Sequence, residues 1–497
     1  MSARKIDVLF VHPGDRKQIY QSLGDEFCAI EPPVFAGLFA TYMRRRGAEV
    51  AIYDVPAMFV SAEAAVSEMM AAYDPRLVVL CVYGSQPSAS TQNMTSAGKI
   101  ARLFKERVPA CPVLMTGTHP AALPERTMQE ECVDFVCDGE GPVTIAGTLE
   151  ALAGRGVLAD VPGLWWRDGD AVVKPKAAAP LVRNLDEEMP GVAWDLLPME
   201  RYRAHNWHCF DHIDRRSPYA AIHTSLGCPY RCHFCCINAP FHKPSYRMWS
   251  PATVVAEIEV LVMRYGVRNI KFVDEMFVLN RAHVEGICDL LIERGLDVNI
   301  WAYARVDTVF EDLLPKMKRA GFNWLCLGIE SASDYVRDGA NKTFRNDDVI
   351  GVVRRIQAAG IRIIGNYIFG LPDDSMERMQ QTLDLALELN CEFANFYSAM
   401  AYPGSALYAE AAAKGLPLPA QWHHYSQHSP DTMPLPNDHC TGEDILRFRD
   451  QAWNLYFNHP AYLDMVRDKF GEAVVEHIRL MTSIPLARRY HSTGESK

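Results

Sequence analysis

Short apolar runs alternate with longer amphipathic stretches over the first 155 residues of the chain. A helix-length segment such as residues 32–47 follows the apolar runs, which have the length of β-strands. This rhythm is typical of βαβ units, so we predict a doubly wound parallel sheet, and hence an α/β fold, over residues 1–155. The predicted strands are residues 6–11, 49–55, 76–83, 111–117 and 133–141.

The same alternation returns after a break. Residues 156–215 contain a predicted hairpin at 163–173 and a proline- and acid-rich connection, and we interpret them as a linker that covers part of the next domain. Six further strand-helix repeats without a dinucleotide-binding glycine fingerprint favour a partial barrel of TIM type over residues 216–414, with its site at the carboxyl ends of the strands. Residues 415–497 are expected to form a small helical carboxyl-terminal region, with two helices near 443–482. The predicted barrel strands are residues 219–225, 269–275, 298–306, 324–331, 361–370 and 392–400.

Composition narrows the class of protein. With 497 residues, of which 49% are hydrophobic, the chain can build two or three domains with ordinary cores. No apolar run reaches the length of a membrane span and no signal-peptide pattern opens the chain, so we expect a cytoplasmic protein without a membrane partner. In that compartment, 14 cysteines argue against a disulfide framework. A formal net charge of −11 disfavours nucleic acid as a partner and suits a neutral or cationic small molecule.

Four cysteines lie close together directly after the first predicted barrel strand. Cys228, Cys232 and Cys235 have C-x3-C-x2-C spacing, which lets three thiolates reach one iron–sulfur cluster from a single loop. Cys236 is adjacent to Cys235 and should project elsewhere, so we expect it to pack behind the loop. A zinc site is the alternative, but zinc sites usually pair two C-x2-C hooks or add histidines at helical spacing, and no second hook follows.

Phe234 completes a pattern with the three cysteines. The segment resembles the signature of the radical S-adenosylmethionine (radical SAM) enzymes, in which an aromatic residue precedes the third cysteine. The resemblance implies a [4Fe–4S] cluster on Cys228, Cys232 and Cys235, with S-adenosylmethionine chelating the open iron and Phe234 beside this cofactor. It also implies reductive cleavage to a 5′-deoxyadenosyl radical that abstracts a hydrogen atom, with electrons from a flavodoxin- or ferredoxin-like donor.

Polar residues stand at the ends of successive predicted barrel strands, where the resemblance places the contacts to S-adenosylmethionine. Carboxylates on the second strand match the position that binds the amino group, and an arginine on the third suits the carboxylate. Side chains on the fourth strand resemble the ribose or amino contacts, and one on the fifth lies where the adenine is bound. These residues are Asp274, Glu275, Arg305, Glu330, Ser331 and Asn366.

The first predicted domain resembles the cobalamin-binding fold of one subgroup of these enzymes. No D-x-H-x-x-G follows its first strand, and His12 and His119 are wrongly framed to act as the usual cobalt ligand. Bound cobalamin and a scaffold without cofactor therefore both remain open. Residues in the loops after the strands, where a doubly wound sheet binds ligands, are candidate cobalamin contacts, namely Ser85, Gly117, Gly139 and Gly141.

Two reactions suit a radical enzyme with this pair of domains. The whole chain resembles the radical diol dehydratases of aminoglycoside antibiotic biosynthesis, which implies a lyase that dehydrates a 1,2-diol in an amino sugar and passes its product to a downstream reductase. A cobalamin-dependent C-methyltransferase or a cyclase is the alternative, and a non-catalytic iron–sulfur or cobalamin carrier is the alternative of another class. Dehydration needs a general acid, which the sequence does not identify. The candidates near strand ends are His223, Glu392, Tyr397 and Tyr402.

Overall fold

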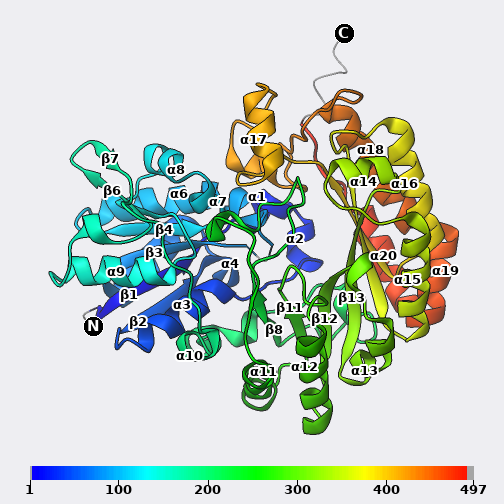
Figure 1. Cartoon of the computed structure of the whole chain (residues 1–497), viewed down its shortest axis with the longest axis horizontal. Helices are drawn as coiled ribbons and strands as arrows, with labels where there is room; N and C mark the ends of the chain where they lie inside the picture. The colour runs from blue at the N-terminus through cyan, green and yellow to red at the C-terminus, as the bar shows by residue number, and fades with distance from the viewer. Residues whose placement is uncertain (1–2, 85, 490–497) are drawn as a thin grey trace.

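The computed structural model describes residues 3–84 and 86–489, apart from the side chains of residues 346 and 347. Two sheets lie side by side, each with its own helices, and together they make the elongated molecule seen in Figure 1. The amino-terminal part of the chain builds one sheet and the central part builds the other. The predicted α/β class is therefore confirmed.

The first sheet has the strand order β2-β1-β3-β4-β5-β6-β7, and its first five strands are parallel. The carboxyl-terminal halves of β1 and β3 are continuous apolar runs because helices cover both faces of the sheet. Thus Val8 and Phe10 of β1 pack into one core cluster, and Leu9 and Val11 pack into a second. The parallel strands are β1 (Arg4–His12), β2 (Val50–Asp54), β3 (Tyr73–Val82), β4 (Val113–Gly117) and β5 (Phe135–Cys137). The main helices of this domain are α3 (Val34–Arg44), α5 (Ala62–Ala72), α6 (Ala89–Arg107), α7 (Thr118–Ala122), α8 (Pro124–Glu130) and α9 (Pro142–Leu152).

The hairpin predicted at 163–173 is present as β6 (Leu164–Asp168) and β7 (Ala171–Val173). It does not stand apart in the connection, because β6 pairs antiparallel with β5 and extends the first sheet. The local pattern predicts the turn, but it does not say to which edge a hairpin is added.

The second sheet has six parallel strands in the order β15-β14-β13-β12-β11-β8. Its two edge strands do not pair with each other, so the sheet is the predicted partial barrel. The strands are β8 (Tyr219–Ile222), β11 (Asn269–Phe272), β12 (Asn299–Arg305), β13 (Phe322–Glu330), β14 (Arg362–Phe369) and β15 (Phe393–Ser398). The helices between them are α11 (Pro251–Tyr265), α12 (Arg281–Arg294), α13 (Leu314–Arg319), α14 (Asp334–Gly339), α15 (Asn346–Ala358) and α16 (Met376–Leu389).

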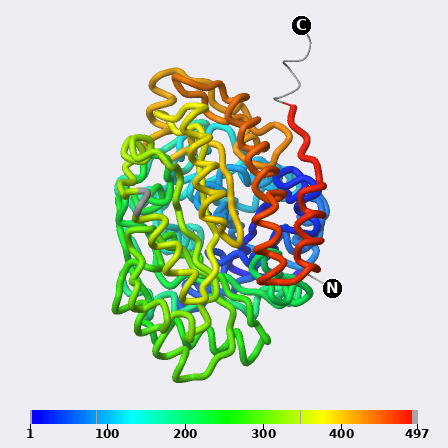
Figure 2. The backbone as a smooth tube through the Cα atoms, turned by 90° about the vertical axis from the view of Figure 1, so that its right-hand side faces the viewer, coloured from blue at the N-terminus to red at the C-terminus, as the bar shows by residue number. Residues whose placement is uncertain are grey.

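The carboxyl-terminal region contains three long helices where two were predicted. They are α18 (Gly442–Phe457), α19 (Pro460–Phe470) and α20 (Glu472–Ser483). Pro460 starts α19, and Gly471 ends it with a φ of 87°, so the segment is broken twice where two predicted helices require one break. Figure 2 shows these helices in red beside the blue amino-terminal segment, where the rings of Phe27 and His477 are 5.0 Å apart.

The amino-terminal segment also closes the open side of the barrel. Helices α1 (Arg16–Tyr20) and α2 (Leu23–Glu26) lie between the two sheets (Figure 1). Just after them, Glu31 Oε1 is 3.0 Å from Lys271 Nζ of β11 and accepts a hydrogen bond from the Tyr219 hydroxyl at 3.0 Å. The first domain therefore inserts a carboxylate between the strands of the second.

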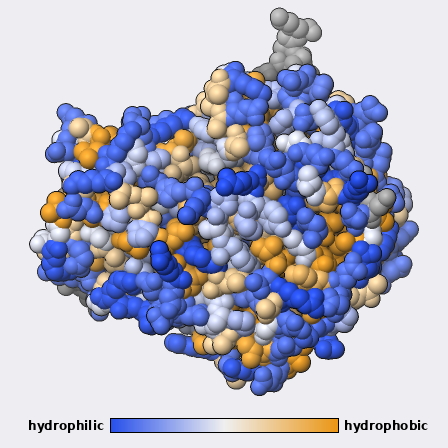
Figure 3. Space-filling model, in the orientation of Figure 1, coloured by the Kyte–Doolittle hydropathy of each residue, from blue (hydrophilic) through white to orange (hydrophobic). Residues whose placement is uncertain are grey.

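The surface seen in Figure 3 is mainly hydrophilic, with apolar side chains in separate groups. Within the described residues, no helix combines the length and the apolar character that crossing a bilayer requires.

Candidate functional site

Two hollows of about 30 Å³ each lie between the two sheets, and we call them together the interdomain cavity. The first domain contributes residues that follow β1 and β3, and the barrel contributes residues that follow β8 and β11. Since parallel α/β sheets bind ligands at the carboxyl ends of their strands, the cavity lies where both domains would place a site. The residues that line both hollows are Phe35, Tyr83, Gly84, His223 and Val273.

The cysteine loop begins just beyond β8, next to this cavity. The Cys228 side chain is buried, and Cys232 and Cys235 are partly exposed. Burial raises the pKa of all three thiols, that of Cys228 to about 12, and the charge of Cys232 acts on both Cys228 and Cys235. The thiols must lose their protons when they bind metal, so cluster assembly is coupled to proton release.

Cys236 and Phe234 fix the back of the loop. Cys236 is 3% exposed, and its Cβ is 3.6 Å from where a Cβ on Gly404 would stand, so it packs behind the loop as expected. Phe234 packs against apolar residues that include Leu371 and Leu407. The aromatic residue of the motif therefore anchors the loop to the top of the barrel.

Asp274 and Glu275 have different environments, although both were predicted to bind the amino group of S-adenosylmethionine. Asp274 Oδ1 accepts the backbone N–H groups of Thr224 at 2.6 Å and Ser225 at 3.1 Å, and the Thr224 hydroxyl donates to Oδ2. The predicted contact of Asp274 with the amino group of S-adenosylmethionine is thus not supported, because its carboxylate holds the start of the cysteine loop. Glu275 lines the interdomain cavity, and burial raises the pKa of its carboxyl to about 7.

Arg305 lies at the cysteine loop, at the predicted end of β12. Its Nη1 is 3.8 Å from Cys232 Sγ, and its guanidinium is 4.1 Å from the centre of the Tyr230 ring. Nε and Nη2 donate to the two carboxylate oxygens of Asp307 at 2.9 and 3.0 Å. Arg305 is therefore placed to act on the thiolate of Cys232 as well as on an incoming anion.

Glu330 adopts a left-handed backbone conformation, with a φ of 65°, at a break in the register between β13 and β14. Such strain in a non-glycine residue is concentrated at functional sites. Its carboxylate pairs with Lys342, a residue that the sequence analysis missed. Lys342 belongs to the turn after α14, and its charge also lowers the pKa of Cys232. No motif marks it, because only the fold of the turn brings it to the strand ends.

Ser331 and Asn366, the other two residues predicted to contact S-adenosylmethionine, lie in different surroundings. Ser331 is fully buried, and its Oγ is 3.2 Å from Thr382 Oγ1 of α16, so it belongs to the packing of a helix on the sheet. Asn366 lies between neighbouring strands, where its Nδ2 donates to Cys326 Sγ at 3.0 Å and its Oδ1 accepts from Asn395 at 2.9 Å. Asn366 therefore belongs to a polar row across β13, β14 and β15.

His223 is the one catalytic candidate that lines both hollows. Its side chain is 9% exposed, and neither ring nitrogen has a hydrogen-bond partner among the described residues. Nδ1 is 3.7 Å from Asp274 Oδ1, which leaves Nε2 for the cavity, and the Phe35 ring is 5.0 Å away. A buried imidazole without partners is costly, and a bound ligand would supply the missing partner.

The remaining candidates lie farther from the cavity lining. Tyr397 is on β15, and burial raises the pKa of its hydroxyl. The Tyr402 hydroxyl donates to the backbone carbonyl of Tyr425 at 3.3 Å, and burial raises its pKa to about 12. The choice of Glu392 is wrong, because this residue precedes β15 at the amino end of the strand. There its Oε2 accepts the backbone N–H of Ile363 at 2.8 Å.

The glycines of the first domain are required by its own packing. A Cβ on Gly117 would lie 2.2 Å from the Val82 carbonyl oxygen, and one on Gly141 would lie 2.8 Å from the Phe39 ring. A Cβ on Gly139 would meet the Cβ of Ala179 at 2.9 Å. Close approach of a cofactor is thus not needed to explain these residues. Ser85 lies outside the described residues.

The two histidines of the first domain are not equivalent. His12 lines the cavity, with its Nδ1 3.4 Å from the Cys81 carbonyl oxygen. His119 is 1% exposed, its Nδ1 is 3.1 Å from Thr91 Oγ1, and burial lowers its pKa to about 3. His119 is therefore a neutral packing residue.

The residues present fit the expected groups. Three neighbouring thiols provide the soft donors that an iron–sulfur cluster requires. The Glu275 carboxylate, on the same side of the cavity, suits an ammonium group. Phe35 and Tyr83, whose ring centres are 3.9 Å apart, give the first domain an aromatic wall opposite the unpartnered His223.

Comparisons with known proteins agree with this arrangement. Residues 222–386 match the radical SAM superfamily, and residues 23–149 match the B12 binding domain family. An uncharacterized methyltransferase of Pyrococcus horikoshii is 31% identical over 82% of this chain and 83% of its own length. An anaerobic magnesium-protoporphyrin IX monomethyl ester cyclase of Rubrivivax gelatinosus is 27% identical over 82% of this chain and 70% of its own length.

Two solved structures share the fold. The radical S-adenosylmethionine methyltransferase TsrM of Kitasatospora setae has a TM-score of 0.67 and 18% identity, over 92% of this chain and 90% of that chain. The cobalamin-dependent S-adenosylmethionine radical enzyme OxsB has a TM-score of 0.71 and 14% identity, over 96% of this chain and 72% of that chain.

These findings define the protein as a radical SAM enzyme with an amino-terminal B12-binding domain. The chain belongs to the cobalamin-dependent radical SAM enzymes. The expected [4Fe–4S] cluster and S-adenosylmethionine are thereby confirmed as its cofactors, and the B12-binding domain supports cobalamin as the third.

Proposed function

We propose that this protein is a cobalamin-dependent radical SAM methyltransferase that adds a methyl group to a carbon of a small molecule. The observation that carries the proposal is the interdomain cavity, because it is lined both by the B12-binding domain and by residues beside the cysteine loop. The methyltransferase of Pyrococcus horikoshii and TsrM, which is described as a methyltransferase, support the same reaction class.

Diol dehydration of an amino sugar, the first expectation from the sequence, has no counterpart among the relatives named above. They favour the stated alternative of methyl transfer or cyclisation. We therefore propose methyl transfer, and the tests below separate it from reactions that use the radical alone.

When bound, the cluster and S-adenosylmethionine would supply a radical that abstracts a hydrogen atom, and cobalamin would supply the methyl group. Cys228, Cys232 and Cys235 would hold the cluster. The Glu275 carboxylate would bind the amino group of S-adenosylmethionine, and the Arg305 guanidinium, 3.8 Å from Cys232 Sγ, would bind its carboxylate. These two side chains would set the orientation of the cofactor.

His223 would orient the substrate. Its Nδ1 faces Asp274, which is itself held by the cysteine loop, so the imidazole is fixed with Nε2 toward the cavity. A substrate hydroxyl or N–H group could donate to Nε2. This contact would place the reacting carbon between the cysteine loop and the aromatic wall of the first domain.

Segments from the amino-terminal and carboxyl-terminal parts of the chain would limit the access of water to the cavity. Glu31 and Lys271 form a buried ion pair at the open side of the barrel, and Gln427 caps the end of β15 by accepting from Ser398. A closed cavity protects a reactive intermediate from side reactions.

The products of S-adenosylmethionine test the proposal. The reconstituted enzyme, with hydroxocobalamin and a strong reductant, would be incubated anaerobically, and the nucleoside products would be quantified by mass spectrometry. Formation of S-adenosylhomocysteine together with 5′-deoxyadenosine is the expected result, because one reports methyl donation and the other radical formation. Formation of 5′-deoxyadenosine without S-adenosylhomocysteine would contradict methyl transfer and revive dehydration or cyclisation.

A further inference from the structure

Residues 422–432, which we call the strap, connect the two domains. The strap begins with η8 (Trp422–Tyr425), which packs on α6 of the first domain. There the ring of Trp422 lies 4.4 Å from the ring of His119. Farther along, the Gln427 side chain accepts the backbone N–H of Ser398, at the end of β15, at 2.9 Å. The strap therefore contacts the B12-binding domain and the barrel at once.

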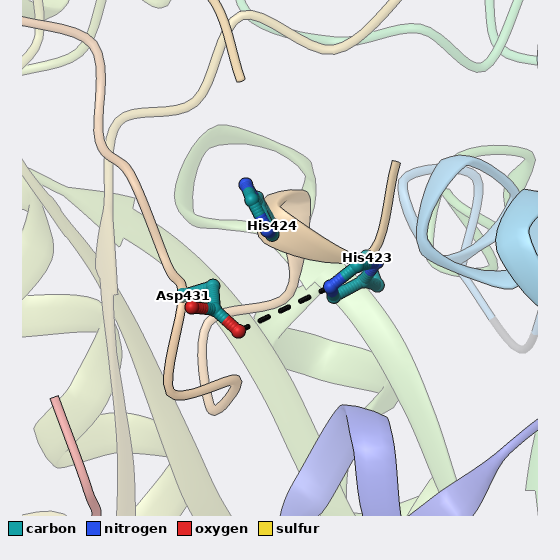
Figure 4. A group of neighbouring side chains, drawn as sticks. All are labelled: His423, His424 and Asp431. Carbon is teal, nitrogen blue, oxygen red and sulfur yellow. Dashed lines mark ion pairs between the residues drawn. The ribbon is translucent and has the colours of Figure 1, made fainter. Parts of the chain in front are cut away.

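Three potential metal ligands converge on the strap (Figure 4). They are His423, His424 and Asp431, and one ligand atom of each lies within 4.8 Å of the others. The closest approach drawn is that of His423 Nε2 to Asp431 Oδ2, at 4.0 Å. This distance is too long for a hydrogen bond, yet it is close to the separation of two ligands on one ion, since zinc binds N and O donors at about 2.0–2.2 Å.

A residue of the B12-binding domain orients the His423 ring. Thr95 of α6 holds Nδ1 at 3.3 Å, which leaves Nε2 directed at Asp431. A partner on the second ring nitrogen is the usual support of a metal-binding histidine, because it fixes the ring and its tautomer.

Asp431 is presented by a rigid turn. Thr432 Oγ1 donates to the Ser429 carbonyl at 2.8 Å, and Met433 N donates to the His424 carbonyl at 3.3 Å, which closes the turn onto η8. Arg489 Nη1 is 3.1 Å from Asp431 Oδ1, so this oxygen is neutralised and Oδ2 remains toward His423.

We propose that His423, His424 and Asp431 bind one divalent ion of the zinc type, and that this ion clamps the strap between the two domains. The ligand set contains two nitrogens and one oxygen, with water completing a tetrahedron, which suits zinc. In Figure 4 the His424 ring stands above the line from His423 to Asp431, and one of its nitrogens lies within 4.8 Å of a ligand atom of each. The site is separate from the cysteine loop and is independent of the proposed methyl transfer.

Metal content tests the site directly. The holoprotein, with its iron–sulfur cluster reconstituted, would be incubated with zinc sulfate, desalted, and analysed for iron and zinc by mass spectrometry. We expect about one zinc per chain in the wild type, in line with a single three-ligand site. His423→Ala and the near-isosteric Asp431→Asn should retain almost none, whereas His439→Ala, which removes an exposed histidine elsewhere in the same region, should retain it fully.

Two further readouts keep the result decisive. The iron content of the same samples shows whether a variant has kept its folded barrel, so zinc loss with normal iron reports the site alone. X-ray absorption at the zinc edge should show only N and O neighbours at about 2.0–2.2 Å, because zinc on the cysteines would show sulfur at about 2.3 Å. A wild type that retains no zinc, a His423→Ala variant that retains as much, or a sulfur shell would each overturn the proposal.

Discussion

Glu31 of the first domain reaches between the strands of the second and pairs with Lys271, whose side chain is only 2% exposed, at 3.0 Å. The two residues are 240 positions apart in the chain. The pair joins the segment that closes the open side of the barrel to a strand beneath the site. Its position means that the two domains are assembled around a common, buried charge pair.

Breaking this pair should destabilise the protein. In Glu31→Gln the Lys271 ammonium keeps its burial but loses its charged partner, which typically costs about 3 kcal/mol or more for a buried pair. Chemical denaturation followed by tryptophan fluorescence would measure the loss. The double variant Glu31→Gln, Lys271→Met should recover part of it, since both charges of the pair are then removed; a double variant as unstable as the single one would contradict this explanation.

Substitution of the four loop cysteines should distinguish the three cluster ligands from the one packing residue. Cys228→Ala, Cys232→Ala or Cys235→Ala should each abolish cluster assembly, because each variant removes one of the three thiolates that would hold the cluster. Cys236→Ala is the matched control, and it should keep an iron content near normal because its side chain packs behind the loop against Gly404. Iron analysis and the visible spectrum after anaerobic reconstitution check both outcomes, and a cluster lost in Cys236→Ala would refute the assignment.

Asp274 and Glu275 should differ in their effects. Asp274→Asn weakens the hydrogen bonds to Thr224 and Ser225 that start the cysteine loop, so iron incorporation should fall. Glu275→Gln should keep the cluster and weaken S-adenosylmethionine binding by about tenfold or more, because a charge-assisted hydrogen bond is worth about 1.5–3 kcal/mol.

Equilibrium dialysis with labelled S-adenosylmethionine, beside iron analysis, would distinguish the two roles. Equal loss of iron in both variants would show that Glu275 also serves the loop. Unchanged cofactor binding in Glu275→Gln would remove it from the site.

Glu257 should make stability depend on pH. Burial raises the pKa of its carboxyl to about 7, while Oε1 accepts from Val192 N at 2.8 Å and Trp194 Nε1 at 2.9 Å. Because the folded state holds this proton more tightly than the unfolded state, the stability it provides is full below pH 4.5 and is lost as the pH rises to about 7.

Glu257→Gln keeps both acceptor bonds without the charge. The free energy of unfolding of this variant should therefore rise relative to that of the wild type between pH 5 and 7, by about 2 kcal/mol at pH 7. Thermal unfolding of both proteins across this pH range would test the prediction. A constant difference between them would contradict the raised pKa.

The sequence predicted those features that depend on local pattern. The strand alternation located both sheets, and the spacing of Cys228, Cys232 and Cys235 located the cluster loop. Features set by tertiary contacts were missed. Asp274 turns to the cysteine loop, Lys342 comes from a turn without a motif, and the choice of Glu392 failed because a residue close to a strand can stand at its amino end.

The whole-chain resemblance to dehydratases carried less information than the motifs. It rested on chain length, the acidic surface and the compact carboxyl tail together with the missing cobalt-ligating histidine after β1. The B12-binding domain, its aromatic wall and the unpartnered His223 are nevertheless all present. An absent ligand residue therefore does not decide whether the cavity holds a corrin ring.

Corrinoid content is the most direct measurement of the central claim. The protein would be purified anaerobically, reconstituted with iron, sulfide and hydroxocobalamin, desalted, and analysed for bound corrinoid by its visible spectrum and by mass spectrometry. The account predicts stoichiometric corrinoid beside a full cluster, with less corrinoid retained by a variant that fills the cavity, such as Gly84→Trp. A full iron–sulfur cluster without retained corrinoid would contradict it, because the first domain would then be a scaffold and the methyl transfer proposed here would have no donor.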